Sequence, residues 1–320
     1  MNALPYVRPA DVEPQVRWRD MVQAMRRGHR LPRADIDDII FRHERNTLLN
    51  RAAWIEQLGI AVKTATIFPG NGEQQPPLPS VNTLVTLFDD QTGVPRALLD
   101  GAMVTKWKTA TDSVLGAQLL ARPDSERLLI VGAGTVARSL VSAYSALFPG
   151  LKRIQIWNRT DDKAAALADE LTGPAIPVNA VSDLAGAVSE ADIVSTATLS
   201  QEPILRGDWV TPGTHVDLIG AFRPDMREAD DVLLLKSELF VDARETTLEH
   251  IGELCIPLQR GVIDASFVRG DLYDLCNGGP GRSSDQSITL YKNGGGAHLD
   301  LMTADYLLQV FAAGSASQLD

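Results

Sequence analysis

Residues 127–160 have the sequence RLLIVGAGTVARSLVSAYSALFPGLKRIQIWNRT, and this stretch decides the fold of the chain. Its apolar run, Leu128–Val131, is typical of a buried parallel strand. The run leads into Gly132–Ala137, which has the G-x-G-x-x-A spacing of the dinucleotide-binding fingerprint. Apolar residues then recur at helical spacing until Pro149-Gly150, and Arg153–Trp157 begins another strand. This order predicts a nucleotide site, with a merely structural tight turn as the alternative.

The residues of the fingerprint have separate predicted roles in binding a dinucleotide. Gly132 allows the tight turn, Gly134 lets the backbone approach a pyrophosphate, and Ala137 lets the helix pack closely on the strand. Thr135 and Val136 begin the helix, whose free N–H groups face the phosphates.

The end of the second strand bears on the choice of cofactor. An NAD site usually places Asp or Glu there, to accept from the ribose hydroxyls. Here the strand ends in Asn158, Arg159 and Thr160, which suit a 2′-phosphate that an acidic residue would repel. We therefore expect NADP(H), with NAD(H) possible. The alternative is a surface arginine in a turn, because Asp161 and Asp162 follow closely.

Composition excludes several classes of protein. A chain of 320 residues is long enough for two domains. The net charge of −11 argues against a nucleic-acid surface. No apolar run approaches the roughly 18 residues that a membrane-spanning helix needs, and the N-terminus lacks the order of a signal peptide. Two cysteines and five scattered histidines indicate a cytoplasmic protein with free thiols and no metal.

The part before the fingerprint is predicted to be rich in strands. We expect a helix with the apolar stripe Trp18, Met21, Val22 and Met25, strands over Ile36–His43, Leu48–Ile55, Gly59–Phe68, Val81–Phe88 and Arg96–Val104, and a helix over Thr109–Ala121.

After the fingerprint, strands and helices alternate, which is the signature of a parallel sheet. The predicted strands are Ala175–Val178, Asp192–Ala197, Gly213–Ala221, Leu239–Asp242 and Ser287–Lys292, and the helices are Asp162–Leu171, Ser182–Ser189 and Val232–Lys236. Ligands of such sheets lie at the carboxyl ends of the strands. Thr196, Ala197, Thr198 and Gly220 are therefore expected to touch the nicotinamide half of the cofactor, although they could be ordinary sheet-edge turns.

The predicted fold class is α/β. A Rossmann-type, doubly wound parallel sheet over residues 121–296 is inserted into a discontinuous α+β domain over residues 1–120 and 297–320. The tail from Gly252 onward is glycine-rich and looks less regular, and a final helix over His298–Phe311 returns to the first domain. Near this end, His298 and Asp300 are expected to be helix N-terminal contacts, and Asp112 is expected to be solvated.

Several stretches together resemble the ornithine cyclodeaminase/mu-crystallin family. They are Gly59–Lys63, Thr105–Ser113, Gly132–Arg138, Trp157–Thr160, Thr211–Glu228, Gly252–Leu254 and Gly281–Asp300. The match covers nearly the whole chain in order. It implies a substrate-binding and dimerisation domain split around a Rossmann domain, and a homodimer.

The resemblance also implies roles for individual residues. Arg42 matches an arginine that grips the substrate carboxylate, and Lys63 matches a lysine beside the substrate. Lys108 stands where the family more often has arginine, so the charge is kept but the bidentate fork is lost. Val136 replaces a common glutamine, which puts that cofactor contact in doubt. Phe222 stands where ornithine cyclodeaminases have an aspartate.

The replacement at Phe222 separates the candidate reactions. Cyclodeamination must take a proton from an amine and pair with an ammonium group, and an apolar side chain does neither. We therefore expect an NAD(P)H-dependent reductase of a small cyclic imino acid, Δ1-pyrroline-2-carboxylate or Δ1-piperideine-2-carboxylate, giving L-proline or L-pipecolate. In it Lys63 acts near the imine, Arg42 and Lys108 hold the carboxylate, and Phe222 lies against the ring. The alternatives are an ornithine cyclodeaminase, an alanine dehydrogenase, or a non-catalytic crystallin-like protein that binds NADPH.

Overall fold

A computed structural model describes residues 4–171, 173 and 176–316 of the chain. The chain forms two compact units. The first unit comprises Met1–Lys108 and Gly296–Asp320, and the second comprises Thr109–Gly295.

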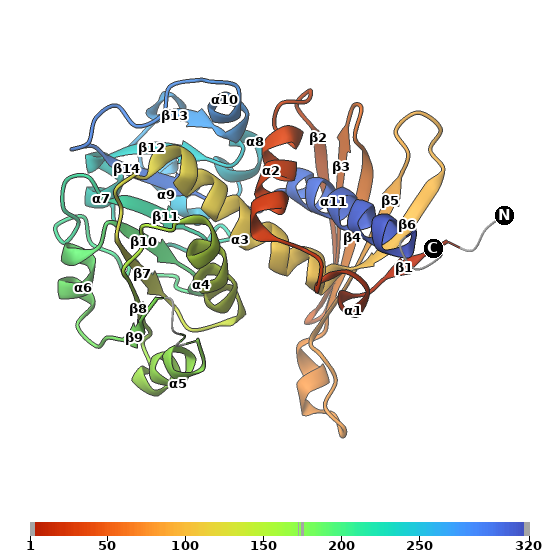
Figure 1. Cartoon of the computed structure of the whole chain (residues 1–320), viewed down its shortest axis with the longest axis horizontal. Coiled ribbons are helices and arrows are strands. Elements are labelled where there is room, and N and C mark those ends of the chain that lie inside the picture. Colours follow the sequence, from red (N-terminus) through yellow and green to blue (C-terminus); the bar gives the residue numbers. More distant parts are fainter. Residues whose placement is uncertain (1–3, 172, 174–175, 317–320) are drawn as a thin grey trace. The chain divides into compact units, whose positions relative to one another are not determined.

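The first unit is built on a six-stranded sheet (Figure 1). In sheet order the strands are β1 (Tyr6–Val7), β6 (Pro95–Asp100), β5 (Val81–Phe88), β4 (Gly59–Ile67), β3 (Asn46–Ile55) and β2 (Asp35–His43). Neighbouring strands are antiparallel except β1 and β6, which are parallel. The predicted strands of this region are confirmed, except that β6 ends at Asp100 rather than Val104.

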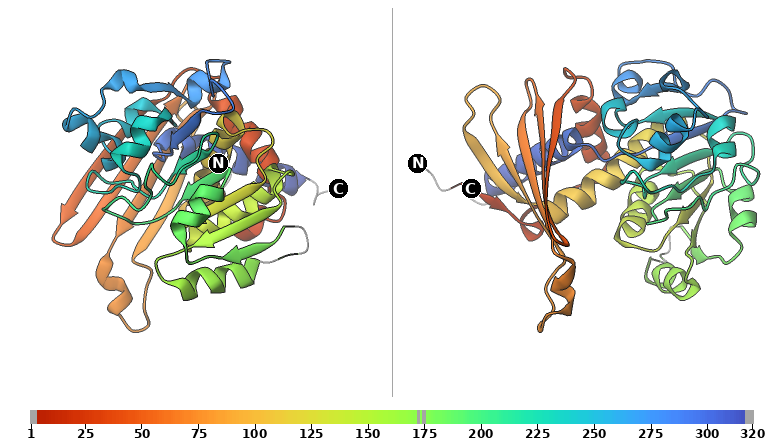
Figure 2. Two further views of the ribbon diagram at one scale, coloured as in Figure 1. Left: turned by 90° about the vertical axis from the view of Figure 1, so that its left-hand side faces the viewer. Right: turned by 180° about the vertical axis from the view of Figure 1, so that it is seen from behind.

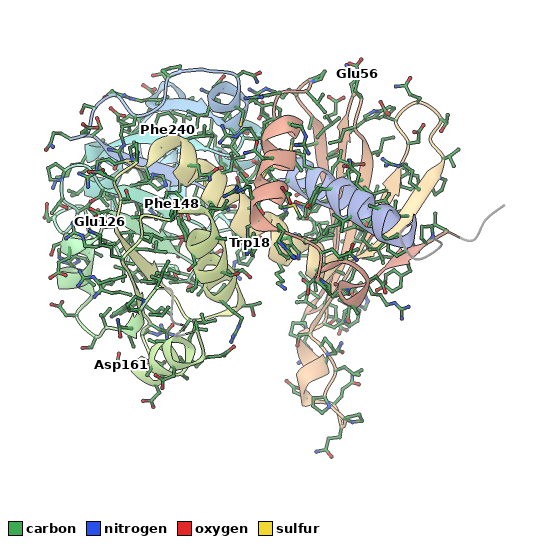
Figure 3. The ribbon with its side chains drawn as sticks, viewed as in Figure 1. Trp18, Glu56, Glu126, Phe148, Asp161 and Phe240 are labelled. Carbon is green, nitrogen blue, oxygen red and sulfur yellow. The ribbon has the colours of Figure 1, made fainter. Side chains whose placement is uncertain are left out.

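Helices cover one face of this sheet (Figures 1 and 2). They include α2 (Trp18–Gly28) and α11 (Ala297–Ala316), with α1 (Pro9–Val12) and the 3-10 turn η1 (Pro69–Glu73) completing the unit. The predicted stripe of α2 is confirmed, because Trp18, Met21, Val22 and Met25 are all buried. Trp18, labelled in Figure 3, packs on Trp107 with ring centroids 4.1 Å apart.

The two faces of the sheet differ, as the pleat of β4 shows. Ala61, Lys63 and Ala65 are buried and lie on one face. The residues that alternate with them lie on the other face and are only half-buried: Ile60, Val62, Thr64 and Thr66. The covered face therefore carries a lysine in an otherwise apolar row.

The second unit contains an eight-stranded sheet in which every pairing is parallel. Its strands are β7 (Arg127–Val131), β8 (Arg153–Trp157), β9 (Val178–Ala180), β10 (Ile193–Thr196), β11 (His215–Leu218), β12 (Ser237–Val241), β13 (Val268–Asp271) and β14 (Ile288–Lys292). Their order is β13-β12-β14-β11-β10-β7-β8-β9. The chain thus moves outward from β7 through β8 to β9 and then returns to β10 on the other side of β7. This is the doubly wound arrangement, so the predicted fold class is confirmed.

All the connections between these strands except the one from β10 to β11 contain helices. They are α4 (Thr135–Leu147), α5 (Asp161–Leu171), α6 (Leu184–Glu190), α7 (Asp231–Lys236), α8 (Arg244–Thr247), α9 (Gly252–Gln259), η2 (Ala265–Phe267) and α10 (Leu272–Cys276). The core is made by the strand residues of the sheet together with the apolar sides of these helices, and Phe240 of β12, labelled in Figure 3, is fully buried. Of the helices within the described ranges, none combines the length and the apolar character needed to cross a bilayer.

Three predictions about elements were wrong. Helix α3 (Gly101–Leu120) begins eight residues before the predicted Thr109, because the Asp100 side chain accepts from the N–H of Met103 (2.7 Å) and caps it. Strand β9 begins only at Val178, the last residue of the predicted Ala175–Val178, of which Ala175 is outside the described residues. The tail after Gly252 is more regular than expected, since it holds α9, β13 and α10.

The prediction for Asp112 was also wrong. This residue is fully buried within α3 and accepts a hydrogen bond from the hydroxyl of Tyr291. The second half of α3 is buried on nearly all sides, so it has no solvated face that could hold a charged residue.

Candidate active site

The glycine-rich turn after β7 has a backbone that only glycine adopts without strain. Gly132 has φ +124°, and a Cβ added there would lie 2.5 Å from the carbonyl oxygen of Ala197. Its N–H donates to the carbonyl of Trp157 (2.7 Å), so the turn is fixed to β8. The protein's own backbone at Ala197 therefore requires glycine at position 132.

The second glycine of the fingerprint, Gly134, is not required by steric contacts within the protein as Gly132 is. Gly134 is the N-cap of α4 and no side chain caps this helix. A Cβ at Gly134 would meet nothing within 4 Å, so the protein itself does not demand glycine there. Thr135 and Val136 begin the helix, and Ala137 is fully buried against the sheet. An uncapped helix N-terminus of this kind suits a phosphate.

The residues predicted to choose the cofactor follow β8. Arg159 and Thr160 are exposed, and Asn158 is half-buried. The amide of Asn158 donates to the carbonyl of Thr160 (3.0 Å), which shapes the turn into α5. Asp161 and Asp162 occupy the first turn of that helix, where they interact favourably with its dipole.

The carboxyl ends of β10 and β11 are tied together by Glu228, a residue that the sequence prediction missed. The Glu228 carboxylate accepts from Thr196 Oγ1 (2.7 Å), from the N–H and Oγ1 of Thr198 (2.9 and 2.7 Å), and from the N–H of Gly220 (2.6 Å). A Cβ at Gly220 would clash with the Thr198 backbone at 2.0 Å. One buried carboxylate thus sets the positions of both loops predicted to face the nicotinamide.

A second buried carboxylate holds Glu228 in turn. The side chain of Glu253 accepts from the backbone N–H groups of Glu228 (2.7 Å) and Ala229 (3.0 Å). Burial raises the pKa of Glu253 to about 7, although the charge of Lys292 opposes the rise. Burial also lowers the pKa of Lys292, whose ammonium group donates to the carbonyls of Leu218 and Asn293.

The first unit holds a separate cluster of charges. Asp300, in the first turn of α11, accepts from Lys63 Nζ (3.1 Å) through one oxygen and from Lys108 Nζ (2.8 Å) through the other. Lys63 comes from β4 and Lys108 from α3, and all three side chains are buried. Thr105 also accepts from Lys63. The predicted helix-terminal position of Asp300 is confirmed, and its pairing with two lysines was not foreseen.

This environment shifts two pKa values. Burial lowers the pKa of Lys108 from 10.5 to about 8, with Asp300 opposing the shift and Lys63 and Arg51 adding to it. Burial opposes ionisation of Asp300 too, but the charges of Lys108, Lys63 and Arg51 lower its pKa below the usual value. Asp300 is therefore ionised at neutral pH, and Lys108 titrates at a pH close to neutral. Beside them, burial lowers the pKa of His298 well below its ordinary value, so this histidine is neutral.

Within the first unit, the structure does not bring Arg42 to the buried lysines. Arg42 is exposed on the edge strand β2, opposite Thr47 in β3, near the β2–β3 turn. Phe222 follows β11 on the second unit and is 58% exposed, with the guanidinium of Arg223 over its ring. Lys63 and Lys108 are in contact through Asp300.

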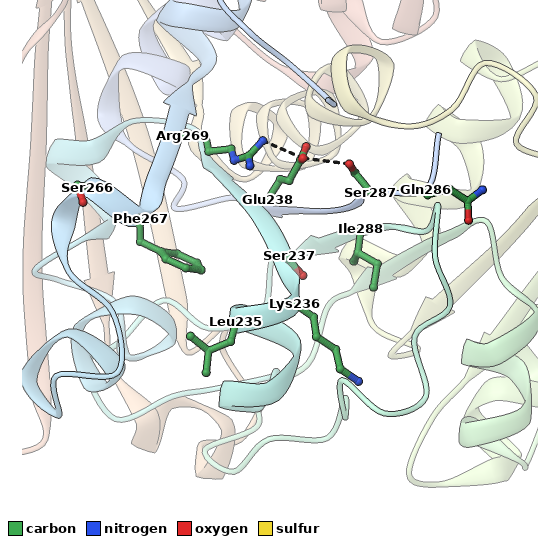
Figure 4. Close-up of a pocket in the computed structure, with 10 residues that line it drawn as sticks. All are labelled: Leu235, Lys236, Ser237, Glu238, Ser266, Phe267, Arg269, Gln286, Ser287 and Ile288. Carbon is green, nitrogen blue, oxygen red and sulfur yellow. Dashed lines mark hydrogen bonds and ion pairs between the residues drawn. The ribbon is translucent and has the colours of Figure 1, made fainter. Parts of the chain in front are cut away.

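A cavity of about 670 Å³ lies elsewhere on the second unit (Figure 4). It is bordered by Ser237 and Ile288, the first residues of β12 and β14, and therefore lies at the amino ends of the strands. Its carboxylate, Glu238, already binds Arg269 (2.8 Å) and Ser287 (3.0 Å). Ligands of doubly wound sheets bind at the opposite edge, so we do not assign the active site here.

Metal binding has no structural support within the described ranges. They contain no group of three or more His, Cys, Asp or Glu residues arranged to hold an ion. The expected absence of a metal stays a prediction.

Comparisons with known proteins agree over nearly the whole chain. Residues 43–314 match the ornithine cyclodeaminase/mu-crystallin family. The Δ1-pyrroline-2-carboxylate reductase of Paracoccus denitrificans is 53% identical over 303 residues, covering 94% of this chain and 95% of that protein.

Solved structures give the same result. The Thermococcus litoralis Δ1-pyrroline-2-carboxylate reductase, in complex with NADH and L-proline, has a TM-score of 0.87 and 28% identity, and the match covers 96% of this chain and 97% of that one. An archaeal alanine dehydrogenase dimer with bound NAD has a TM-score of 0.88 and 25% identity, covering 99% and 97%. The resemblance predicted from the sequence is confirmed.

Proposed function

The chain belongs to the ornithine cyclodeaminase/mu-crystallin family, and from this premise we propose that it is an NAD(P)H-dependent reductase of a small cyclic imino acid. The preferred substrate is Δ1-pyrroline-2-carboxylate, giving L-proline, with the six-membered homologue as the other candidate. The name of the 53% identical relative and the proline bound to the T. litoralis enzyme support this choice.

The buried cluster of Lys63, Lys108 and Asp300 is the observation that carries the proposal. Two ammonium groups from different elements meet at one carboxylate in a place shielded from water. Hydrogen bonds from ammonium groups to a carboxylate are among the stronger polar contacts in proteins. We assign binding of the carboxylate of a small imino acid to Lys63 and Lys108.

The proposed reaction needs little more than positioning. When bound, the reduced nicotinamide supplies a hydride to C2 of the protonated imine, and the C=N electron pair moves to nitrogen to give the amine. Lys63 orients the substrate and keeps a proton near the imine nitrogen. No negative charge develops at the reacting carbon or nitrogen, so an oxyanion hole is not required.

Phe222 favours reduction over ammonia release. Cyclodeamination of ornithine requires a group that accepts a proton from an amine and pairs with the second ammonium. Phenylalanine has neither capacity, and it instead offers an apolar surface to the ring of the substrate.

The fingerprint turn supports a nicotinamide dinucleotide as cofactor. The uncapped start of α4 and the open position of Gly134 fit a pyrophosphate held by Thr135, Val136 and Ala137. The residues Thr196–Thr198 and Gly220 are assigned to the nicotinamide end.

We assign a preference for NADP(H) to the exposed turn after β8. Arg159 there offers a guanidinium to a 2′-phosphate, with Asn158 and Thr160 as hydrogen-bonding neighbours. Arg159→Ala should raise KM for NADPH about tenfold and leave KM for NADH nearly unchanged. Equal effects on both cofactors would remove Arg159 from this role.

The experiment that tests the proposed function compares two reactions of the purified protein. Loss of NADPH or NADH absorbance is followed with Δ1-pyrroline-2-carboxylate, and ammonia is measured with L-ornithine and NAD. Rapid oxidation without ammonia release is the expected result. Ammonia release without net oxidation would identify a cyclodeaminase, and tight NADPH binding without turnover would identify a binding protein.

A homodimer is also proposed, through the uncovered face of the six-stranded sheet. Apolar side chains are exposed on this face, and the register places Ile39 of β2 in line with Leu84 of β5, and Trp54 of β3 beside Ile60 of β4. Ile39, Trp54 and Leu84 are 53%, 49% and 36% exposed. Several large apolar side chains exposed on one face of a sheet mark a candidate protein interface.

A further inference from the structure

Arg51 lies on the same face of the sheet as the active-site lysine. It is directly opposite Lys63 in the antiparallel pair β3–β4, and directly opposite Asp38 in the pair β2–β3. Directly opposite residues of an antiparallel pair point to the same face, with Cβ atoms about 5 Å apart. The row Asp38, Arg51, Lys63 therefore runs across three strands on the face that α11 covers.

The charge of Arg51 acts on the whole cluster. It lowers the pKa of Lys108, lowers the pKa of Asp300 and lowers the pKa of His298. Asp300 pairs with Lys63, the residue directly opposite Arg51, and with Lys108.

Arg42 lies farther along the sheet from the two lysines than Arg51 does. Arg42 and Asp38 are four residues apart on β2, which separates them by about 13 Å along the strand. Arg42 is opposite Thr47, close to the turn, and is exposed. Arg51 is one strand away from Lys63 in the same row, and its side chain is only 24% exposed.

Three cations and two carboxylates lie in this cluster. Lys63 and Lys108 pair with Asp300, and Arg51 pairs with Asp38. Asp38 binds Arg51 at Nε with both oxygens, at 3.1 and 3.0 Å. This bond fixes the plane of the guanidinium beside the lysines.

We propose that Arg51, rather than Arg42, is the arginine that binds the substrate carboxylate, alongside Lys63 and Lys108. The inference rests on the proposed function and adds a binding residue to it. A guanidinium recognises a planar carboxylate through paired N–H donors, which an ammonium group cannot do. Arg51 thus restores the geometric selectivity that a lysine at position 108 lacks.

The test compares a substrate with its counterpart that lacks the carboxylate. Arg51→Met is assayed with Δ1-pyrroline-2-carboxylate and with 1-pyrroline. Because a hydrogen bond between charged groups is lost, kcat/KM for the acid should fall about tenfold to hundredfold. The value for 1-pyrroline should stay within about twofold of wild type, and KM for the cofactor should not change.

Three further variants make the comparison specific. Arg51→Lys keeps the charge and should recover part of the loss. Arg45→Met removes an exposed arginine of the same hairpin, which pairs only loosely with Glu73 (3.8 Å), and should behave as wild type. Arg42→Met decides between the two arginines. If Arg42→Met impairs the acid selectively and Arg51→Met does not, the proposal is overturned.

A binding measurement separates this inference from the proposed function. Titration calorimetry with pyrrole-2-carboxylate, a planar acid that is not reduced, is carried out on the cofactor-loaded protein. Arg51→Met should weaken its binding at least tenfold even if wild type reduces no imine. Unchanged binding, or an equal loss on the acid and on 1-pyrroline, would show that Arg51 serves only the packing of the sheet.

Discussion

Lys108 combines two demands that conflict within one side chain. In its proposed role it must be charged to attract a carboxylate, and it is buried, which lowers its pKa to about 8. Asp300 partly restores the charged form, while Lys63 and Arg51 work against it. The residue is therefore poised to lose its proton slightly above neutral pH.

A pH dependence follows from this. The charged form of Lys108 predominates below its pKa, so kcat/KM for the imino acid should fall as pH rises through about 8. Lys108→Arg keeps its charge at all accessible pH values, so this alkaline limb should be weakened or shifted upward in the variant. If kcat/KM falls at the same alkaline pH in wild type and in Lys108→Arg, the fall reflects titration of the substrate or of another group.

Lys63 allows a second prediction at the same scale. Lys63→Ala removes the cation nearest the proposed imine and leaves Asp300 with a single partner, so kcat/KM should fall at least a hundredfold. The affinity for NADPH, measured by fluorescence titration, should remain unchanged. Lys106→Ala, which removes an exposed lysine bound to Glu13, is the matched control and should retain activity. Unchanged turnover in Lys63→Ala would remove this residue from the mechanism.

The individual site residues were only partly predictable from the sequence. Lys63 stood out because it interrupts an apolar strand, and the structure does bury it. Arg51 was missed although the predicted strand ends at Ile55 and Gly59 already imply that Arg51 and Lys63 are opposite. Asp300 was placed at a helix start, but its pairing with Lys108 joins residues 192 positions apart, and no local pattern encodes that contact.

At the scale of elements, the ends of β10 and β11 depend on one side chain. Glu228 accepts four hydrogen bonds from the two loops, and its own backbone is held by Glu253. All the groups hydrogen-bonded to the Glu228 carboxylate are donors. An amide at this position would turn its NH2 group, itself a donor, toward one of these donors, so one hydrogen bond would be lost.

Glu228→Gln tests this arrangement. The variant should lose about 1–3 kcal/mol of unfolding free energy, and KM for the cofactor should rise several-fold because Thr198 and Gly220 shift. Thermal denaturation and steady-state kinetics measure the two effects. Glu202→Gln, at an exposed position nearby, should change neither. If Glu228→Gln binds the cofactor as tightly as wild type, the two loops do not depend on this carboxylate.

Element prediction succeeded where periodicity was strong and failed where a cap or a short strand decided the boundary. The βαβ unit around Gly132 was found because its three elements have distinct patterns. The start of α3 was missed because the capping role of Asp100 was not recognised. The segment after Gly252 was misjudged because β13 is four residues long and its glycine weakens the strand signal.

At the scale of the whole molecule, the sheet of the first unit has one face that helices cover and one that they do not. Parallel strands covered by helices are buried on both faces, whereas an antiparallel sheet commonly leaves one face to solvent. That face would normally be polar, yet here it carries Ile39, Phe41 and Trp54. A second copy of the chain is the partner proposed to cover it.

The double variant Ile39→Lys/Leu84→Lys tests the proposed dimer. Charges in the centre of an apolar interface should convert the protein to a monomer, because they would be buried without partners. Light scattering coupled to size exclusion gives the mass directly. Leu235→Lys places a lysine at a similarly exposed leucine of the second unit and should leave the mass unchanged. A wild-type protein that is already monomeric at micromolar concentration would contradict the proposal.

The pairing of Asp300 with Lys63 and Lys108 has a consequence for how the protein is made. Asp300 follows Lys108 by 192 positions, and the entire second unit is synthesised within that interval. Until then Asp300 is not available to the two lysines, and α11 does not yet cover the sheet. The cofactor-binding unit can thus fold during translation, whereas the cluster proposed to bind the substrate can close only afterwards. A nascent chain stalled before α11 would be expected to hold its dinucleotide without being able to act on an imine.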